Sequence, residues 1–480
     1  MRTNGILLAL SSLPSKYGIG SFGNESYEFI DLLNVAGIKI WQLLPLNPTG
    51  FGNSPYQSSS GKAIDPIYVS LDDLYLKGYI SRPRKFNPLA TKVEYDKVRN
   101  FKNKYLQRAF KKQNDTETQE FKSFLKENSW CEAYAKFSVL TDKNNGEPWY
   151  NWKENEKQAY YNGFNFKKFE KKILYYEWVQ FILYKEFFDL VNYASKKNVK
   201  FMGDIPFYVG DNSSDVWASQ DDFLLGEDGK PTFIAGCPPD FFSKTGQRWG
   251  NPIYDWEYMK SDNFTFWIER IKFAAKLFSY VRIDHFRAFD TYYEIPASCQ
   301  TAEIGEWKNG YGNEILSMVQ DLNLDSEIVA EDLGDLFPSV LVLRDKFNLK
   351  GMNIVEFNIT NPIFKVSQNQ IIYTGTHDND TIVGWYKSLT KEEKEQVKII
   401  LRMNGITQKK TNKKFIEFAF KNIADYAIIP LVDYLGLGSE CRMNVPGTLG
   451  GNNWAFKLKD FKDFKKEIPY IQSIIKKYNR

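Results

Sequence analysis

Histidine and cysteine are scarce in this sequence of 480 residues, which contains two histidines and four cysteines. The cysteines are widely spaced, with no CxxC pair and no histidine close by, at positions 131, 237, 299 and 441. This spacing argues against a zinc site and a disulfide framework, and it favours a reducing compartment such as the cytoplasm. Asp378 and Asp380 flank Asn379, but they lack a calcium-loop pattern, so we expect no metal ion there.

Long apolar runs and blocks of like charge are also missing. No stretch of about 18 apolar residues occurs, so we expect no membrane span. The apolar run from Ile6 to Leu10 is short and no small-residue cleavage site follows it, which favours a first buried strand over a signal peptide. The net charge of +4 is small for this length and is not concentrated, so nucleic acid is a poor candidate partner.

Aromatic residues are plentiful: they make up 16% of the chain, with 12 Trp and 29 Tyr. Together with an apolar content of 43%, they allow a sizeable core and leave rings to line a surface that binds sugar rings. The length suits one large barrel with insertions, or two to three domains.

Short, continuously apolar runs recur along the chain and end in polar residues. Continuous apolarity is typical of strands that are covered on both faces, and helical patterns separate several of these runs. Eight such runs interleaved with helices predict a (β/α)8 TIM barrel, an α/β fold with its chemistry at the carboxyl ends of the strands. The runs lie at 5–12, 38–46, 199–207, 280–286, 328–334, 352–357, 371–380 and 426–433.

Two spacings between these runs are irregular. Residues 70–195 are too long for one crossover and have helical periodicity, so we expect a mostly helical insertion subdomain after strand 2. Residues 211–256 mix Gly, Pro and aromatics, which favours an ordered lid-like insertion after strand 3. The expected organisation is therefore barrel strands 1 and 2 in 1–69, the insertion in 70–195, and the rest of the barrel, with the lid-like insertion, in 196–480.

The run VRIDHFRAF places a carboxylate, Asp284, between Arg282 and His285 at an expected strand end. Nearby positive charge favours the ionised form, and an ionised carboxylate at a barrel mouth is a plausible nucleophile. A structural salt bridge at a strand end is the alternative for this residue taken alone.

Two further carboxylates favour a catalytic role for Asp284 over a structural salt bridge. Glu331 ends another run beside Asp332, and a like charge raises a carboxyl's pKa, as a general acid requires. Asp378 ends a third run and follows His377, so both histidines of the chain adjoin candidate carboxylates. Three carboxylates at one barrel rim suit retaining glycoside chemistry: a nucleophile, an acid/base and a group that supports the charged transition state.

Other residues near the expected strand ends are suited to binding sugars. Asp204 and Asn444 could hydrogen-bond sugar hydroxyls, with a cap or a turn as the alternative. Three aromatic residues could stack on glucose rings, with simple burial as the alternative: Tyr56, Trp249 and Phe357. GIGSFG matches a dinucleotide fingerprint, but no acidic residue ends the second strand, which favours a tight first loop instead.

Several long motifs together resemble the amylomaltases, the 4-α-glucanotransferases or disproportionating enzymes of glycoside hydrolase family 77. The resemblance runs almost end to end and in family order, through GILLALSSLPSKYGIGSFG, WQLLPLNPTGFGNSPYQ, GDIPFYV, PPDFFSKTGQRWGNPIYDW, VRIDHFRAF, AEDLG, THDND and RMNVPGT. It implies a barrel with helical insertions and no cofactor. It also implies Asp284 as nucleophile, Glu331 as acid/base and Asp378 as transition-state stabiliser.

The same resemblance implies which residues contact sugar and which cover it. The implied sugar contacts are Tyr56, Asp204, Trp249, Arg282, His285, His377 and Asn444. A loop with Pro239, Asp240 and Gly246 would cover the glycosidic bond. The implied substrates and partners are malto-oligosaccharides, maltose, glucose and glucans derived from starch or glycogen. An α-glucan hydrolase of the α-amylase type, and a glucan-binding protein without activity, remain alternatives.

Overall fold

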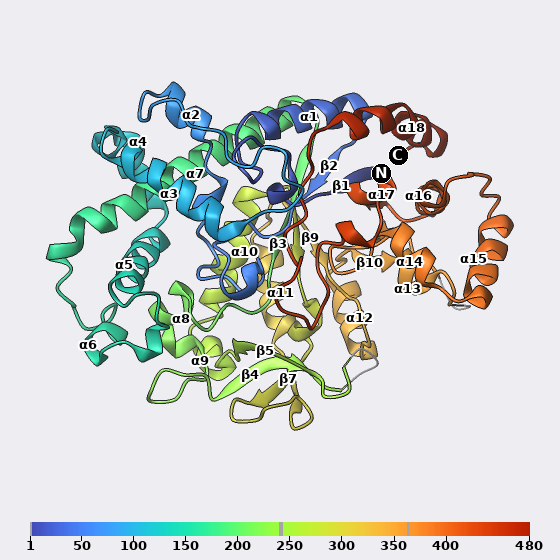
Figure 1. The fold of residues 1–480 in the computed structure, drawn as a ribbon. Helices are drawn as coiled ribbons and strands as arrows, with labels where there is room; N and C mark the ends of the chain where they lie inside the picture. Colours follow the sequence, from blue (N-terminus) through green and yellow to red (C-terminus); the bar gives the residue numbers. More distant parts are fainter. Residues whose placement is uncertain (1, 240–242, 362–364) are drawn as a thin grey trace.

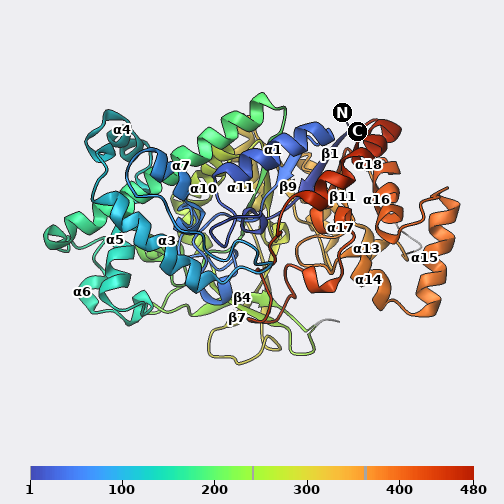
Figure 2. The ribbon, with the colours of Figure 1, turned by 45° about the horizontal axis from the view of Figure 1, so that its top comes forward.

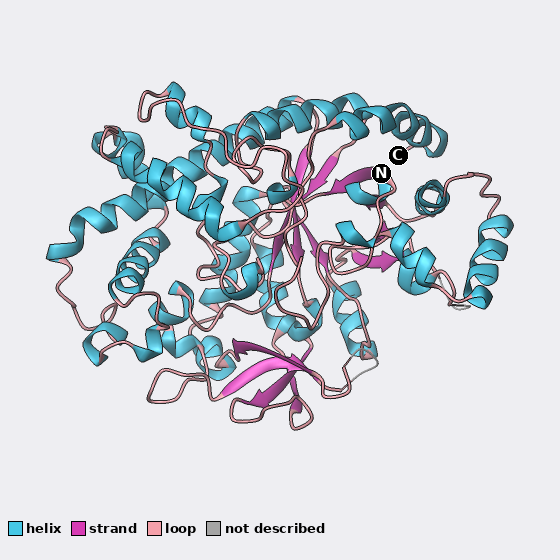
Figure 3. Ribbon diagram, viewed as in Figure 1, coloured by secondary structure: helices cyan, strands magenta, loops and turns pink. Residues whose placement is uncertain are grey.

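A closed ring of eight parallel strands forms the centre of the computed structural model, which describes residues 2–239, 243–361 and 365–480. The strands are β1 (Thr3–Leu7), β2 (Ile40–Gln42), β3 (Lys200–Ile205), β6 (Tyr280–Ile283), β9 (Glu327–Ala330), β10 (Gly351–Ile354), β11 (Gln370–Tyr373) and β12 (Tyr426–Pro430). They are ordered β10-β11-β12-β1-β2-β3-β6-β9, and a parallel bridge between Val329 and Lys350 closes the ring. The predicted (β/α)8 barrel is confirmed, and Figures 1 and 3 look onto its strands.

Both faces of the barrel strands are buried, as their continuous apolarity predicts. Successive side chains of a strand point to opposite faces, so each strand contributes to two cores. The inner core contains Leu7, Ile40, Met202, Val329 and Ile428, which come from five different strands. An outer core joins the strands to the surrounding helices.

Helices surround the barrel on its outside. They include α1 (Asn24–Ala36), α10 (Thr265–Leu277), α11 (Gly312–Asp321), α12 (Pro338–Lys346), α16 (Thr411–Lys421) and α18 (Lys462–Tyr478). Further helices follow the last three strands: α13 (Val355–Asn358), α14 (Ile382–Ser388), α15 (Lys391–Met403) and α17 (Leu431–Leu435). No helix in the described part of the chain is both long and apolar enough to cross a membrane.

The stretch between β2 and β3 is helical. It contains α2 (Leu71–Leu76), α3 (Tyr95–Phe110), α4 (Gln119–Glu127), α5 (Trp130–Lys143), α6 (Glu154–Lys157) and α7 (Glu170–Lys196). Apart from α7, which also reaches the barrel, these helices gather on one side of the molecule (Figure 2). The domain boundaries at 69 and 195 remain a prediction.

The stretch between β3 and β6 contains strands as well as α8 (Ser214–Ala218) and α9 (Trp256–Ser261). Strands β4 (Phe233–Cys237) and β5 (Gln247–Pro252) join β7 (Thr291–Pro296) and β8 (Glu306–Asn309) in a four-stranded antiparallel sheet ordered β5-β4-β7-β8. The sequence interpretation, which expected an ordered loop here, missed this sheet.

The β4–β5 hairpin carries the residues assigned to a covering loop. Gly246 has a φ of +70°, and a Cβ there would lie 2.5 Å from the Cys237 carbonyl oxygen, so this turn requires glycine. Pro239 lies on the other arm, just beyond β4. The predicted loop residue Asp240 falls outside the described residues.

Candidate active site

Asp284 and Glu331 lie side by side at the carboxyl ends of two neighbouring barrel strands. In the parallel pairing of β6 with β9, Ile283 is opposite Ala330, and each carboxylate is the next residue along its strand. The Glu331 N–H donates to the Ile283 carbonyl at 3.0 Å, and the Asp284 N–H donates to the Ile205 carbonyl at 3.0 Å. The barrel register therefore brings both carboxyl groups to one rim.

Arg282 explains the crowding of charge in VRIDHFRAF. Its Nη1 donates to both oxygens of Asp204 at 2.7 Å, and its Nη2 lies 2.9 Å from Asp284 Oδ1. The guanidinium is buried and so links the ends of β3 and β6. Tyr56 extends the network because its hydroxyl donates to Asp204 Oδ2 at 2.7 Å. Removing Arg282 would leave the buried charge of Asp204 unpaired, which is strongly destabilising.

His285 holds Glu331 through its backbone. It adopts a left-handed conformation, with φ 52° and ψ 44°, and its N–H donates to Glu331 Oε2 at 2.7 Å. The Leu333 N–H donates to Glu331 Oε1 at 3.1 Å, so both carboxyl oxygens are fixed. Burial, reinforced by Arg287, lowers the pKa of His285 to about 3. Its imidazole is therefore neutral. The sequence suggested that both residues flanking Asp284 place a positive charge beside it, but of these two only Arg282 does so.

Burial raises the pKa of both neighbouring carboxyl groups. Burial raises the pKa of Glu331 to about 7, Arg282 opposes this, and the charge of Asp284 adds to it. Burial raises the pKa of Asp284 to about 6, with Arg282 as the main opposing effect. The site thus favours a protonated Glu331 beside an ionised Asp284, which is the division of roles that an acid and a nucleophile need.

Asp332 contributes less to the Glu331 pKa than the sequence suggested. Its carboxylate accepts the Met352 N–H at 2.6 Å and pairs with Arg344, which places it in a separate ion pair. Burial is the largest cause of the Glu331 shift, and Asp332 is a small one. Burial of this kind depends on the packed fold and was not visible in the sequence.

Asp378 reaches the same site from the loop after β11. Asn444 Nδ2 donates to Asp378 Oδ1 at 2.6 Å, and His377 Nε2 lies 3.4 Å from Asp378 Oδ2. The Asn444 N–H donates to the His377 carbonyl, so two segments that are distant in sequence are tied together. The Asp378 side chain remains 45% exposed, which leaves it open to a ligand. Its charge acts on Asp284, in accord with their closeness.

Aromatic rings line two sides of these carboxylates. The Tyr56 ring stacks on His377 with centroids 5.1 Å apart and an interplanar angle of 14°, and Trp454 lies 5.8 Å from both. Trp249, from β5, meets the His285 ring edge-on at 4.7 Å. The predicted residues Tyr56, Trp249, His285 and His377 are thus brought together.

Phe357 stands apart from these rings. It lies on α13, directly after β10, and 50% of its surface is exposed. Its position places it at the same rim, between the strands that carry Glu331 and Asp378, and it makes no ring contact within the described residues.

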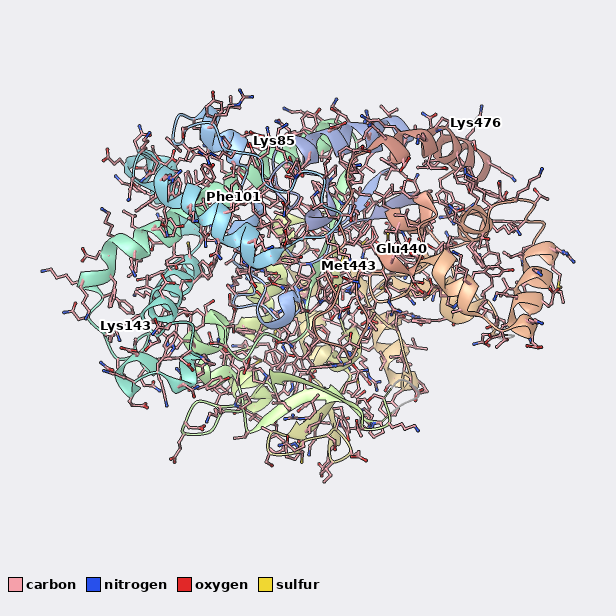
Figure 4. The ribbon with its side chains drawn as sticks, viewed as in Figure 1. Lys85, Phe101, Lys143, Glu440, Met443 and Lys476 are labelled. Carbon is pink, nitrogen blue, oxygen red and sulfur yellow. The ribbon has the colours of Figure 1, made fainter. Side chains whose placement is uncertain are left out.

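Two site residues were missed by the sequence interpretation. Arg442 Nη2 donates to the Asp378 carbonyl at 2.6 Å and its Nε donates to the Asn444 carbonyl at 2.6 Å. Trp454 closes the loop in which Asn444 lies, since its N–H donates to the Met443 carbonyl at 2.7 Å. Figure 4 labels Met443 in the part of the view where the barrel strands converge. Arg442 is the first residue of the RMNVPG motif, and its place in that motif was the signal that could have identified it.

Oxygen and aromatic groups dominate this site, and no protein ligand set for a metal accompanies them. Within residues 2–239, 243–361 and 365–480, no group of three or more His, Cys, Asp or Glu side chains is placed to hold a metal ion. Acid–base and nucleophilic chemistry by carboxyl groups is what the arrangement can perform.

Comparison with known proteins gives one consistent result. The family model of glycoside hydrolase family 77, described as 4-alpha-glucanotransferase, matches residues 8–463. The 4-alpha-glucanotransferase of Synechocystis sp. is 39% identical, covering 96% of this chain and 95% of the relative. That of Thermus thermophilus is 38% identical, with 95% of each covered. The structure of the amylomaltase from Streptococcus agalactiae in complex with acarbose is similar at a TM-score of 0.94 and 33% identity, covering 100% of both chains.

Proposed function

The chain belongs to glycoside hydrolase family 77 and is a 4-alpha-glucanotransferase, and we propose that it moves α-1,4-glucan segments between malto-oligosaccharides by a retaining double displacement. The observation that carries the mechanism is the pairing of an ionisable Asp284 with a more basic Glu331 on adjacent strand ends. Malto-oligosaccharides, maltose, glucose and glucans from starch or glycogen are the proposed substrates.

In the first displacement, Glu331 protonates the glycosidic oxygen while Asp284 attacks the anomeric carbon. The bond to the leaving sugar breaks, and a β-linked glycosyl ester forms on Asp284. Arg282 keeps Asp284 anionic before the attack, and the backbone N–H groups of His285 and Leu333 orient Glu331 toward the leaving oxygen. Covalent catalysis divides one difficult substitution into two easier ones.

In the second displacement, the 4-hydroxyl of an acceptor glucan loses its proton to Glu331 and attacks the anomeric carbon. The ester bond to Asp284 breaks, so Glu331 regains its proton and Asp284 its negative charge. Two inversions at one carbon give net retention. Asp378, held by Asn444, stabilises the positive charge that develops on the sugar ring.

The remaining predicted residues bind sugar in this proposal. The Tyr56 hydroxyl, which donates to the buried Asp204, can accept a hydrogen bond from a ring hydroxyl, so Asp204 contributes to sugar binding by holding Tyr56. Trp249 and Phe357 stack against sugar faces. His377 and Asn444 hold the ring that carries the reacting carbon. An acceptor that is positioned by these rings reacts in preference to water, since orientation of a bound reactant is worth several orders of magnitude in rate.

The β4–β5 hairpin, with Pro239 and Gly246, covers the glycosidic bond in the proposed complex. Trp249 follows this turn on β5, so movement of the hairpin would carry a sugar-stacking ring toward or away from His285. Covering the bond excludes water and strengthens the electrostatic interactions beneath it.

Incubation with maltotriose separates this function from its two alternatives. Transfer yields glucose together with a ladder of longer oligosaccharides. An α-glucan hydrolase would instead leave a pool of glucose and maltose, and a glucan-binding protein would leave the chain-length distribution unchanged. Chromatography of the products over time distinguishes all three.

Asp284→Asn tests the assignment of the nucleophile. The variant keeps the size of the side chain but removes the attacking charge, so turnover of maltotriose should be lost while maltoheptaose still binds. Calorimetric titration measures the binding, and product chromatography measures the turnover. A variant with nearly normal turnover would refute the role of Asp284.

A further inference from the structure

Glu356 is a buried carboxyl group beside the site to which no role has been assigned. It lies on α13, immediately after β10, between the strands that carry Glu331 and the Asp378 loop. Only 6% of its surface is exposed, although it is an acidic residue at the end of a barrel strand. Its N–H donates to the Thr374 carbonyl at 3.3 Å, so the residue is anchored to the end of β11.

The Glu356 side chain supports the turn that carries Asp378. The Glu356 carboxyl group and the Asn379 side chain both lie against Gly375, and Asn379 is close enough to affect the pKa of Glu356. Asn379 Oδ1 in turn accepts the N–H and the hydroxyl of Thr376, both at 2.9 Å. Thr376 Oγ1 then accepts the Asp378 N–H at 3.3 Å. Packing of Glu356 beside Asn379, followed by two hydrogen-bonded links, therefore connects Glu356 to the backbone of Asp378.

Gly375 gives the Glu356 carboxyl group room to reach this turn. A Cβ at Gly375 would lie 2.9 Å from Glu356 Oε1 and 3.0 Å from the Asn379 Cβ. The same Oε1 makes no hydrogen bond within the described residues. The carboxyl group is therefore packed against the bare backbone of Gly375 and beside Asn379.

The charges around Glu356 disfavour its ionised form. Asp433 and Asp380 face it, and Arg442 is the opposing cation. Burial, followed by these two carboxyl groups, raises the pKa of Glu356 well above its usual value. Arg442 is also engaged elsewhere, by the carbonyl groups of Asp378 and Asn444.

We propose that Glu356 is a positioning residue for glucan transfer: its buried carboxyl group packs against the Gly375–Asn379 turn, and through that turn it sets the position of Asp378. Glu356 does not touch the substrate. The role rests on the function proposed above, because Asp378 acts in the transition state of that reaction. The effect of Glu356 should accordingly fall on kcat and leave glucan binding unchanged.

Two substitutions of similar length isolate this role. Glu356→Gln keeps an uncharged carbonyl group beside Asn379, so we expect a kcat within about threefold of the wild type. Glu356→Met fills the same space without hydrogen bonds, so we expect kcat to fall by about tenfold or more, since small displacements of reacting groups have effects of this order. The KM for maltotriose should stay the same in both.

Glu186 provides a matched control. It is 5% exposed, its Oε1 also lacks a hydrogen bond within the described residues, and its Oε2 accepts the Ser70 N–H at 2.9 Å. It lies on α7, outside the carboxyl-end rim. We expect Glu186→Met and Glu356→Met both to lower the unfolding temperature, but only Glu356→Met to lower kcat.

The measurements are kcat and KM for maltotriose transfer, unfolding temperatures, and calorimetric binding of maltoheptaose in an Asp284→Asn background. A normal kcat in Glu356→Met would overturn the proposal. So would a Glu356→Gln variant as impaired as Glu356→Met, because an ionised carboxylate would then be required. A raised KM with unchanged kcat would indicate substrate contact and would also overturn it. Failure of the wild type to form a maltotriose ladder would instead refute the proposed function.

Discussion

Changing the leaving group of the donor separates the roles of Asp284 and Glu331. With maltotriose as donor, kcat/KM requires an ionised Asp284 and a protonated Glu331. Because the pKa of Asp284 is about 6, activity is lost as the pH falls through that value. Because the pKa of Glu331 is about 7, activity is lost as the pH rises through it. The profile should be a narrow bell centred near the midpoint of the two values.

The two pKa values set the size of the effect. The fraction of enzyme with the productive pair of protonation states is highest at the optimum, and beyond either pKa it falls by about tenfold for each further pH unit. An α-maltosyl fluoride donor changes only one side of this profile. Fluoride leaves without a proton, so the alkaline limb should disappear while the acid limb stays. Above the pKa of Glu331, kcat/KM for the fluoride should therefore gain about tenfold relative to maltotriose for each further pH unit.

Initial rates of fluoride release and of maltotriose transfer, measured over the same buffers, provide the assay. Enzyme held at each pH and returned to the optimum should recover full activity, which excludes unfolding as the cause of either limb. An equal alkaline loss with both donors would refute Glu331 as the general acid. A fluoride profile without an acid limb would refute the ionisation assigned to Asp284.

Three further substitutions are expected to have separable effects. Asn444→Ala removes the donor to Asp378 Oδ1, and kcat for maltotriose should fall by about tenfold or more, since hydrogen bonds to charged groups are worth about 1.5–3 kcal/mol; an unchanged kcat would contradict the support that Asn444 gives. Trp249→Ala should raise the KM for maltotriose more than it lowers kcat, as steady-state kinetics would show. Gly203→Ala would drive a Cβ into the Phe278 ring, so the free energy of unfolding should fall by about 1–3 kcal/mol in denaturant titration, with little effect on KM.

The barrel could be predicted from the sequence because its strands carry their own signal. Runs such as 199–207 and 426–433 are apolar without alternation, which only strands buried on both faces require. The antiparallel sheet carries no comparable signal. β4 pairs with β7, and Ile234 meets Ile295 across a large sequence separation, while Gly236 and Pro252 interrupt its strands. Such short strands are stabilised by their partners rather than by local preference.

The residues of the site also include some that the sequence located and some that only the folded structure reveals. Strand ends located Asp284 and Glu331, and the two histidines drew attention to Asp378. Contacts that depend on the assembled fold were not visible: Arg442 binds carbonyl groups from two segments, and Glu356 reads from sequence as an ordinary acidic residue. The burial that separates the two pKa values belongs to the folded chain as a whole, and a pattern of residues cannot give its size.

The closure of the barrel has a consequence for how the chain is made. β1 pairs on one side with β2 and on the other with β12, so Gly5 is opposite both Ile40 and Ile428. Until β12 has been synthesised and has left the ribosome, one edge of β1 has no partner strand. β2 likewise lacks its partner β3 until the helices α2 to α7 have been synthesised. Unpaired strand edges promote aggregation, and long-range pairing slows folding. The ring cannot close without β12, so nascent chains halted before β12 should depend on chaperones for their solubility.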